Sequence, residues 1–169
     1  MKKHIYLIGY MGTGKTTVGN LLSSKLSLPL LEMDEILTDR FSMSISEIFD
    51  AFGEDAFRSA EEDLLEEIST MENPSIVSCG GGVILSDNNR RILRESGTTV
   101  LLQADPMEIF KRLQNNNTRP LLSGGNKLEK ISKIYEERLP LYKEAAEIII
   151  DTDNKTPEEI VDELIPFCK

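Results

Sequence analysis

The stretch Gly9-Tyr10-Met11-Gly12-Thr13-Gly14-Lys15-Thr16 decides the fold of this 169-residue chain. It fits the pattern G-x-x-x-x-G-K-[ST], between an apolar run at His4–Ile8 and an amphipathic segment at Lys15–Leu26. Glycines let the backbone wind tightly, so that successive N–H groups point inward at phosphate oxygens. The start of the following helix adds partial positive charge. The pattern therefore predicts a phosphate-binding loop (P-loop) between a strand and a helix.

Two side chains of the loop have roles in the chemistry of a bound nucleotide. Lys15 would reach the β- and γ-phosphates, and the hydroxyl of Thr16 would ligate Mg²⁺. A glycine-rich turn that matched the pattern by chance would not need a strand before it and a helix after it. Phosphate binding is therefore the better interpretation.

Two omissions separate the chain from other nucleotide-binding classes. GTPases usually carry Asn-Lys-x-Asp to read the base, but Asn126-Lys127 is followed here by Leu128-Glu129. Motor ATPases usually have an apolar strand that ends in Asp or Asp-Glu, whereas the run at 76–78 leads into glycines. Both omissions favour a kinase that acts on a small molecule.

Composition and charge exclude several other classes. The chain is 40% hydrophobic, and no apolar run approaches the ~18 residues of a membrane helix. Its N-terminus has too few apolar residues for a signal peptide, and Cys79 and Cys168 make no disulfide framework. We therefore expect a cytoplasmic protein. With 19 basic and 29 acidic residues, the net charge of −10 argues against general nucleic-acid binding.

One stretch of the chain has the opposite charge. Residues 111–143 hold eight basic residues against three acidic ones, a local charge of about +5. A solvated helix face explains most of the lysines. The arginines fit better a local positive field for a small anion.

Short apolar runs alternate with longer segments of helical period, which is typical of a parallel α/β sheet. The strands are expected at 4–8, 28–33, 75–78, 98–102 and 148–150. The helices are expected at 15–26, 34–40, 46–52, 55–71, 87–96, 106–113, 127–146 and 157–167. The sequence therefore predicts one three-layer α/β/α domain with a five-stranded parallel sheet.

Charged side chains near the second strand are candidates for binding a second substrate. Asp34 follows this strand at the carboxyl edge, where ligands bind in open parallel sheets, and Glu32 lies on the same face. One carboxylate there could accept a hydroxyl proton, although Asp34 could instead cap the next helix. Arg58 is the one base in an acidic helix, so it could bind an anion or pair with Glu61 or Glu62.

Three glycines and two further arginines complete the candidates. Gly80-Gly81-Gly82 follows a buried strand, where it could form a simple turn or allow a ligand to approach the backbone closely. Arg119 and Arg138 both lie near prolines, and guanidinium groups bind phosphate or carboxylate through two parallel hydrogen bonds.

Together these residues resemble the shikimate kinase family over essentially the whole chain. The matching pieces are 9–17, Met33-Asp34, Phe57-Arg58-x-x-Glu61, Gly80-Gly81-Gly82, Thr118-Arg119-Pro120-Leu121-Leu122 and Arg138-x-Pro140-Leu141-Tyr142. Each piece is weak alone, but their order and spacing are specific. The resemblance implies a P-loop fold with strand order 2-3-1-4-5. It also implies ATP-dependent phosphorylation of the 3-hydroxyl of shikimate, on the route to chorismate and the aromatic amino acids.

The resemblance also implies roles for individual residues. ATP would be bound by Gly12, Thr13, Gly14, Lys15, Thr16, Thr17 and Arg119, with one Mg²⁺ ion on Thr16. Asp34 would bind ring hydroxyls, and the shikimate carboxylate would be held by Arg58 and Arg138 in a pocket lined by Gly80, Gly81 and Gly82. The catalytic residues would be Lys15, Asp34 and Arg119.

The implied organisation is one domain over residues 1–169. It would comprise a P-loop core at 4–33, acceptor-binding helices at 34–71 and a lid at 115–126 that carries Arg119. The partners would be ATP and shikimate, with no nucleic acid or membrane, and the protein would be a monomer.

The chain departs from the family pattern at three positions. Glu32 stands where the family commonly has Asp, and Ser78 remains as an outer-shell metal partner because the central strand lacks an Asp. Lys155 stands where many relatives place an arginine that stacks on adenine.

Two other functions compete with this interpretation. A gluconate-type sugar-acid kinase of the same fold would also bind a polyol that carries a carboxylate. A non-catalytic nucleotide switch is disfavoured, because the chain lacks a base-reading motif and has Arg119 on a lid-like loop.

Overall fold

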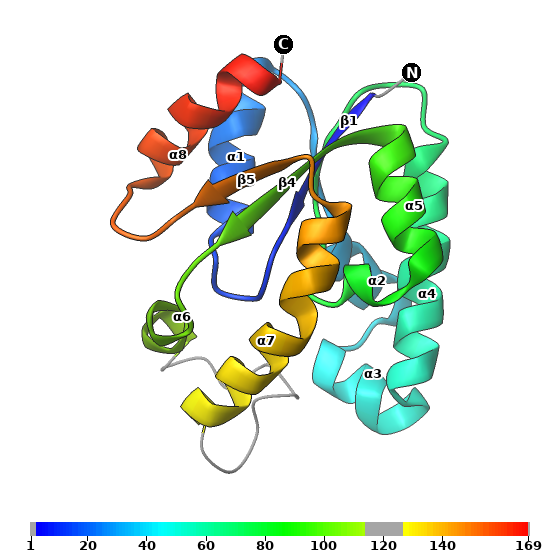
Figure 1. Ribbon diagram of the computed structural model, residues 1–169. Coiled ribbons are helices and arrows are strands. Elements are labelled where there is room, and N and C mark those ends of the chain that lie inside the picture. Colours follow the sequence, from blue (N-terminus) through cyan, green and yellow to red (C-terminus); the bar gives the residue numbers. More distant parts are fainter. Residues whose placement is uncertain (1–2, 114–126, 169) are drawn as a thin grey trace.

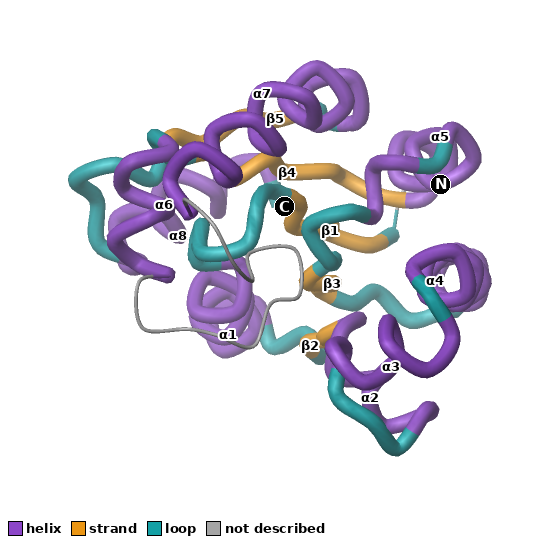
Figure 2. Tube along the Cα trace, turned by 90° about the horizontal axis from the view of Figure 1, so that it is seen from below, coloured by secondary structure: helices purple, strands orange, loops and turns teal. Residues whose placement is uncertain are grey.

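The computed structural model describes residues 3–113 and 127–168, in which five strands form one parallel sheet. The strands are β1 (His4–Ile8), β2 (Leu30–Glu32), β3 (Ile76–Ser78), β4 (Gly97–Gln103) and β5 (Ile148–Asp151). Their order is β2-β3-β1-β4-β5, seen along the edge of the sheet in Figure 2. The predicted strand number, direction and order are confirmed, and β1, which leads into the P-loop, lies at the centre.

Helices cover both faces of the sheet, so the predicted three-layer architecture is also confirmed. The helices are α1 (Lys15–Leu26), α2 (Met33–Phe41), α3 (Ile45–Phe52), α4 (Glu54–Ser69), α5 (Asp87–Ser96), α6 (Pro106–Leu113), α7 (Lys127–Ala145) and α8 (Pro157–Leu164), with 3₁₀ turns η1 (Val83–Leu85) and η3 (Ile165–Phe167). One face is covered by α1 and α8, and the other by α4, α5 and α7 (Figure 1). Among the described residues, no helix has the length and apolar character needed to cross a membrane.

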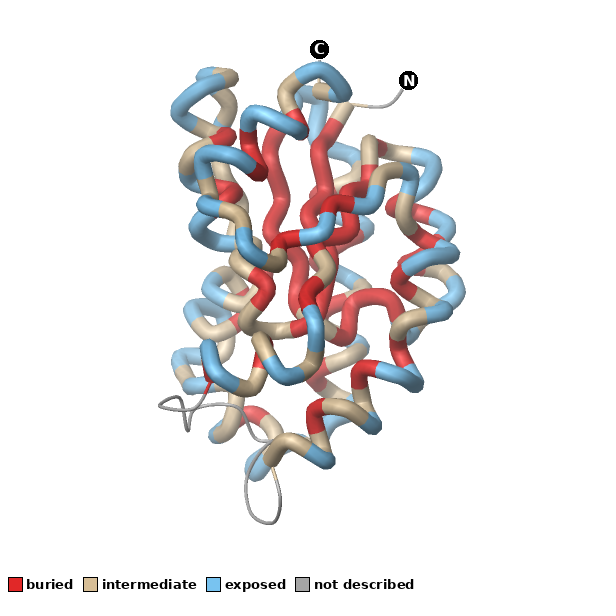
Figure 3. The backbone as a smooth tube through the Cα atoms, turned by 60° about the vertical axis from the view of Figure 1, so that its left-hand side comes forward, coloured by how far each residue is buried: buried red, intermediate tan, exposed pale blue. Residues whose placement is uncertain are grey.

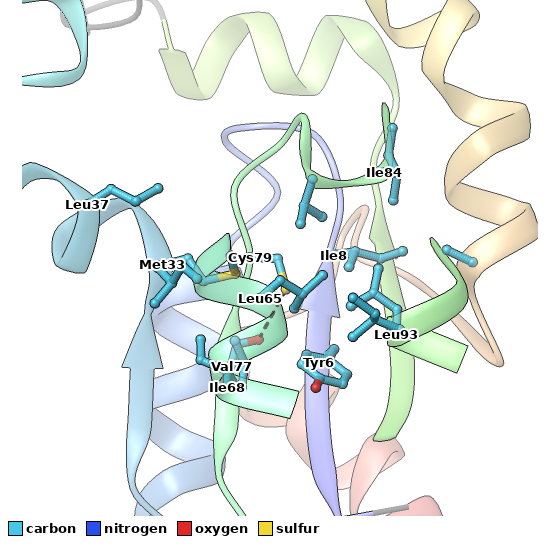
Figure 4. Packing of buried hydrophobic residues seen from close by; sticks show 14 of the residues in the cluster. Tyr6, Ile8, Met33, Leu37, Leu65, Ile68, Val77, Cys79, Ile84 and Leu93 are labelled. Carbon is cyan, nitrogen blue, oxygen red and sulfur yellow. Dashed lines mark hydrogen bonds between the residues drawn. The ribbon is translucent and has the colours of Figure 1, made fainter. Parts of the chain in front are cut away.

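Successive side chains of β1 point to opposite faces of the sheet and so contribute to two separate parts of the core. Tyr6 and Ile8 point to the side of α4, α5 and α7, whereas Ile5 and Leu7 point to α1 and α8. Figure 3 shows the strands buried between exposed helix surfaces, and Figure 4 shows the packing around Tyr6. Because helices cover both faces of the sheet, the sequences of the central strands are almost continuously apolar.

The bounds of several elements differ from the predicted ones, most of all at the second strand and at the last helix. The second strand spans only Leu30–Glu32, and helix α2 begins at Met33. Asp34 therefore lies inside the first turn of α2, and the alternative that Asp34 is the cap is wrong. The last helix ends at Leu164 and continues as η3, because Pro166 has no N–H to donate to the preceding turn.

Helices α2, α3 and α4, where the sequence predicted acceptor binding, pack against one another on the β2–β3 side of the sheet (Figure 2). Aromatic pairs join them: the ring centroids of Phe41 and Phe52 are 5.7 Å apart, and those of Phe49 and Phe57 are 5.3 Å apart. The lid expected at 115–126, with Arg119, lies outside the described residues.

Candidate functional site

The backbone of the P-loop has a shape that requires glycine at two positions. Gly12 and Gly14 have φ values of +83° and +94°, in the left-handed region that disfavours residues with a Cβ. The hydroxyl of Thr13, which is buried, donates to the Tyr10 carbonyl at 2.8 Å and fastens the turn. Helix α1 has no acidic residue in its first turn, so the positive end of its dipole remains available to an anion.

Lys15 extends back across this loop. Its Nζ donates to the carbonyl of Gly9 at 2.6 Å and to that of Tyr10 at 3.1 Å. The ammonium group therefore lies over the loop, where the phosphates of a nucleotide would bind.

A cleft of about 430 Å³ opens beside the loop, at the carboxyl edge of the sheet. It brings together eleven of the residues expected from the sequence, namely Gly12, Gly14, Lys15, Thr16, Thr17, Asp34, Arg58, Gly80, Gly81, Gly82 and Arg138. Of the other two, Thr13 is buried beneath the loop and does not line the cleft. Arg119 lies outside the described residues.

The sequence left open whether Arg58 faces a ligand site or pairs with an acidic neighbour, and in the structure it does both. It lines the cleft, and it also pairs with Glu61 at 3.0 Å and with Glu54 at 3.3 Å. Its guanidinium carbon lies 5.3 Å from the centroid of the Phe57 ring. These contacts hold the guanidinium against the wall of the cleft and leave 21% of its side chain exposed.

Glu61 is a site residue whose environment could not be inferred from the sequence. Its side chain is 1% exposed, and Oε2 has no hydrogen-bond partner. Burial raises the pKa of Glu61 to about 7, although Arg58 opposes this rise, and the negative charge of Asp34 adds to it. The only signal in the sequence was its spacing of three residues from Arg58.

Two of the three glycines, Gly80 and Gly82, allow charged side chains to approach the backbone closely, and none of the three serves a left-handed turn. None of Gly80, Gly81 and Gly82 lies in the left-handed region. A Cβ at Gly80 would lie 2.8 Å from both Asp34 Oδ1 and Glu61 Oε2. A Cβ at Gly82 would lie 2.5 Å from the guanidinium carbon of Arg58. Side chains at these positions would therefore displace the charged groups of the cleft.

Arg138 faces the glycines from the other wall. It comes from α7 and is 6% exposed, with Nη1 3.7 Å from the position that a Cβ would take at Gly81. Arg58 on α4 and Arg138 on α7 thus supply two guanidinium groups to one cleft, and Asp34 supplies a carboxylate. This combination suits a small ligand that has both a carboxylate and hydroxyl groups.

Three oxygen-bearing side chains near the P-loop could hold a metal ion. Thr16, Glu32 and Ser78 all line the cleft. Glu32 Oε1 is buried and has no hydrogen-bond partner, as expected for a carboxylate that accepts a cation. Hydroxyl and carboxylate oxygens are ligands that Mg²⁺ prefers. The residues present therefore fit such an ion.

The sequence did not indicate that Arg112 contacts the P-loop. It lies in the basic stretch at 111–143, and nothing in the sequence distinguished it from its neighbours. Its Nη1 donates to the Gly12 carbonyl at 3.1 Å and to the Thr152 hydroxyl at 3.4 Å. Arg112 therefore ties the P-loop to the segment after β5. Lys155, on that segment, pairs with Glu163 at 2.9 Å.

Comparisons with known proteins agree with this geometry. The family model described as "Shikimate kinase" matches residues 11–169. A shikimate kinase from Thermodesulfovibrio yellowstonii is 42% identical over 163 residues, which cover 96% of this chain and 93% of the relative. The structure of shikimate kinase from Acinetobacter baumannii in complex with shikimate has a TM-score of 0.94 and 30% identity, and covers 99% of this chain and 93% of that chain. A gluconokinase from Sinorhizobium meliloti shares the fold alone, with a TM-score of 0.60, 18% identity, and coverage of 97% and 90%.

Proposed function

The chain belongs to the shikimate kinase family, and from that premise we propose how its residues transfer the γ-phosphoryl group of ATP to the 3-hydroxyl of shikimate. The product is shikimate 3-phosphate, an intermediate in chorismate and aromatic amino acid biosynthesis. The cleft is divided into a nucleotide half at the P-loop and an acceptor half between α4 and α7.

In the nucleotide half, backbone N–H groups from Gly12 to Thr17 bind the phosphates of ATP. Lys15 leaves the carbonyls of Gly9 and Tyr10 and neutralises charge on the transferring group. Arg119 approaches the same phosphates, a role that rests on its match to the family sequence. A lid at 115–126 would exclude water, which would otherwise compete with the acceptor.

In the acceptor half, Arg58 and Arg138 hold the carboxylate of shikimate from opposite walls of the cleft. Gly80, Gly81 and Gly82 leave room for the ring next to these groups. Asp34 binds the ring hydroxyls, orients the 3-hydroxyl toward the γ-phosphate and accepts its proton. The reaction is an in-line transfer in which the protein positions the groups and stabilises charge.

As an ATP-using kinase, the protein works with a divalent metal bound to the nucleotide. We assign this ion as Mg²⁺ and its protein ligand as the hydroxyl of Thr16, with Glu32 and Ser78 in its outer shell. When bound, the ion neutralises negative charge on the phosphates. The buried, unpartnered Oε1 of Glu32 supports this assignment.

The observation that carries this function is a P-loop that shares one cleft with two arginines and a carboxylate. The test is a steady-state assay of the purified protein with ATP and Mg²⁺, in which shikimate is compared with gluconate. We expect a kcat/KM for shikimate roughly 100-fold or more above that for gluconate, because the arginines are placed for a ring carboxylate. Preference for gluconate would contradict the assignment, as would ATP hydrolysis that no acceptor stimulates.

A further inference from the structure

Tyr142 connects helix α7 to the glycine segment of the cleft. It lies four residues after Arg138, and therefore one helical turn further along the same face of α7. Its side chain is fully buried, and its hydroxyl donates to the Gly81 carbonyl at 2.5 Å. A short hydrogen bond thus joins the two elements that supply Arg138 and Gly81 to the acceptor half.

The guanidinium of Arg138 belongs to the same helix, one turn before Tyr142, and its positive charge acts on the hydroxyl. A tyrosine hydroxyl can donate one hydrogen bond and accept another, so Tyr142 can accept from Arg138 while it donates to the Gly81 carbonyl. Burial raises the pKa of Tyr142, and this outweighs the opposing effect of Arg138. The phenol therefore keeps the proton that it donates to Gly81.

We propose that Tyr142 is a positioning residue, whose hydroxyl fixes Arg138 and the Gly81–Gly82 peptide in the orientation that receives the shikimate carboxylate. The inference rests on the proposed role of Arg138. Glycines have wide conformational freedom, so this peptide needs a tether from outside its own segment. Because the peptide is planar and trans, fixing the Gly81 carbonyl also fixes the direction of the Gly82 N–H.

A second connection between α7 and η1 lies further from the cleft, and it should keep the fold intact when the hydroxyl of Tyr142 is removed. Arg90 is 8% exposed and donates to the Ile84 carbonyl of η1 at 2.6 Å. Its Nε lies 2.9 Å from Glu144 Oε2 on α7. Loss of the Tyr142 hydroxyl would therefore leave α7 attached to η1, and only the local orientation of Arg138 and Gly81 would relax.

The test is Tyr142→Phe, which keeps the ring and removes the hydroxyl. We expect the KM for shikimate to rise roughly tenfold, the effect of leaving one buried carbonyl without its hydrogen bond. The KM for ATP should change less than about twofold. The matched control is Tyr135→Phe, because Tyr135 is also buried on α7 but its ring packs against that of Tyr10, with the centroids 6.0 Å apart. This control should leave both KM values unchanged.

A double-mutant cycle shows whether Tyr142 acts through Arg138. In the Arg138→Ala background, Tyr142→Phe should cause a smaller further rise in the KM for shikimate than in the wild type, because one of the two groups that it positions is gone. Full additivity, or a lower Tm with an unchanged KM for shikimate in the single variant, would overturn the inference. If Arg138→Ala alone left this KM unchanged, the proposed role of Arg138 would fail first. If Tyr142→Phe does not fold while Tyr135→Phe does, the hydroxyl of Tyr142 supports the fold as a whole and the inference is overturned.

Discussion

At the scale of single residues, the two arginines of the acceptor half carry the clearest prediction. Arg58→Ala and Arg138→Ala should each weaken shikimate binding strongly, because losing one partner of a buried carboxylate costs about 2–5 kcal/mol. ATP binding should change little. Calorimetric titration of each variant with shikimate and with an ATP analogue measures both. Arg40→Ala is the control, because Arg40 pairs with Glu67 on an exposed surface. Loss of nucleotide affinity would show that the two halves of the cleft are assigned wrongly.

The raised pKa of Glu61 leads us to expect that the stability of the protein depends on pH. Its pKa in the folded protein is about 7, above the ordinary value of 4.5. Between these values the folded state holds a proton that the unfolded chain releases, so this group makes the protein less stable as pH rises. Above pH 7 the destabilisation is complete, on the order of 1–3 kcal/mol.

Glu61→Gln removes this titration. The Tm of the variant minus that of the wild type should therefore increase from pH 5 to pH 8 by several degrees. Asp63→Asn, at an exposed position of α4, should show no such trend. A difference between Glu61→Gln and wild type that stayed constant with pH would contradict the raised pKa.

The residue scale also shows what the sequence could and could not predict. The P-loop was predictable because its chemistry is local, so the spacing of Gly12, Gly14 and Lys15 determines the backbone and the charge. The burial of Glu61 and the contact of Tyr142 with Gly81 depend on segments that meet only in the folded protein. No spacing within one segment could reveal them.

At the scale of elements, the start of α2 decides how Asp34 can act. Asp34 lies in the first turn of this helix, after the N-cap position that Glu32 holds, and its charge there favours the helix dipole. Asp34→Asn should therefore cost only about 0.3–1 kcal/mol of stability.

The effect of Asp34→Asn on turnover should be much larger. An amide can bind a hydroxyl but cannot accept its proton, so kcat should fall roughly 100-fold or more. Glu35→Gln, a neighbour in the same first turn, should keep kcat within a few-fold of wild type. If Asp34→Asn weakened shikimate binding but kept its kcat, Asp34 would only position the ring.

The elements differ in how well local signals fix their bounds. Helix α5 spans Asp87–Ser96 as predicted, because Ser86 caps its first turn and Gly97 ends it. The 3₁₀ turn η1 was not predicted. Its apolar run, Val83–Leu85, turns to pack two buried side chains against the core, which is a tertiary effect. The strand predicted at 28–33 was too long, because an edge strand of three residues shows too little alternation of apolar and polar side chains to define its ends.

At the scale of the whole molecule, the fold brings the candidate residues for both substrates to one edge of the sheet. The crossovers place the P-loop after β1, Asp34 after β2 and the glycines after β3, and these strands are neighbours in the sheet. Ligands of open parallel sheets bind at this edge. The net charge is −10, so the two arginines of the cleft supply local positive charge within an acidic protein.

The central claim is that one cleft transfers phosphate from ATP to shikimate and that Lys15 stabilises the transfer. It is tested most directly by following the γ-phosphoryl group of ATP into shikimate 3-phosphate with wild-type protein and with Lys15→Ala. We predict that wild-type protein forms the product, and that Lys15→Ala lowers kcat roughly 100- to 1,000-fold, the usual effect of removing one such group, with a nearly unchanged Tm. Unchanged turnover in a folded Lys15→Ala variant would contradict the account.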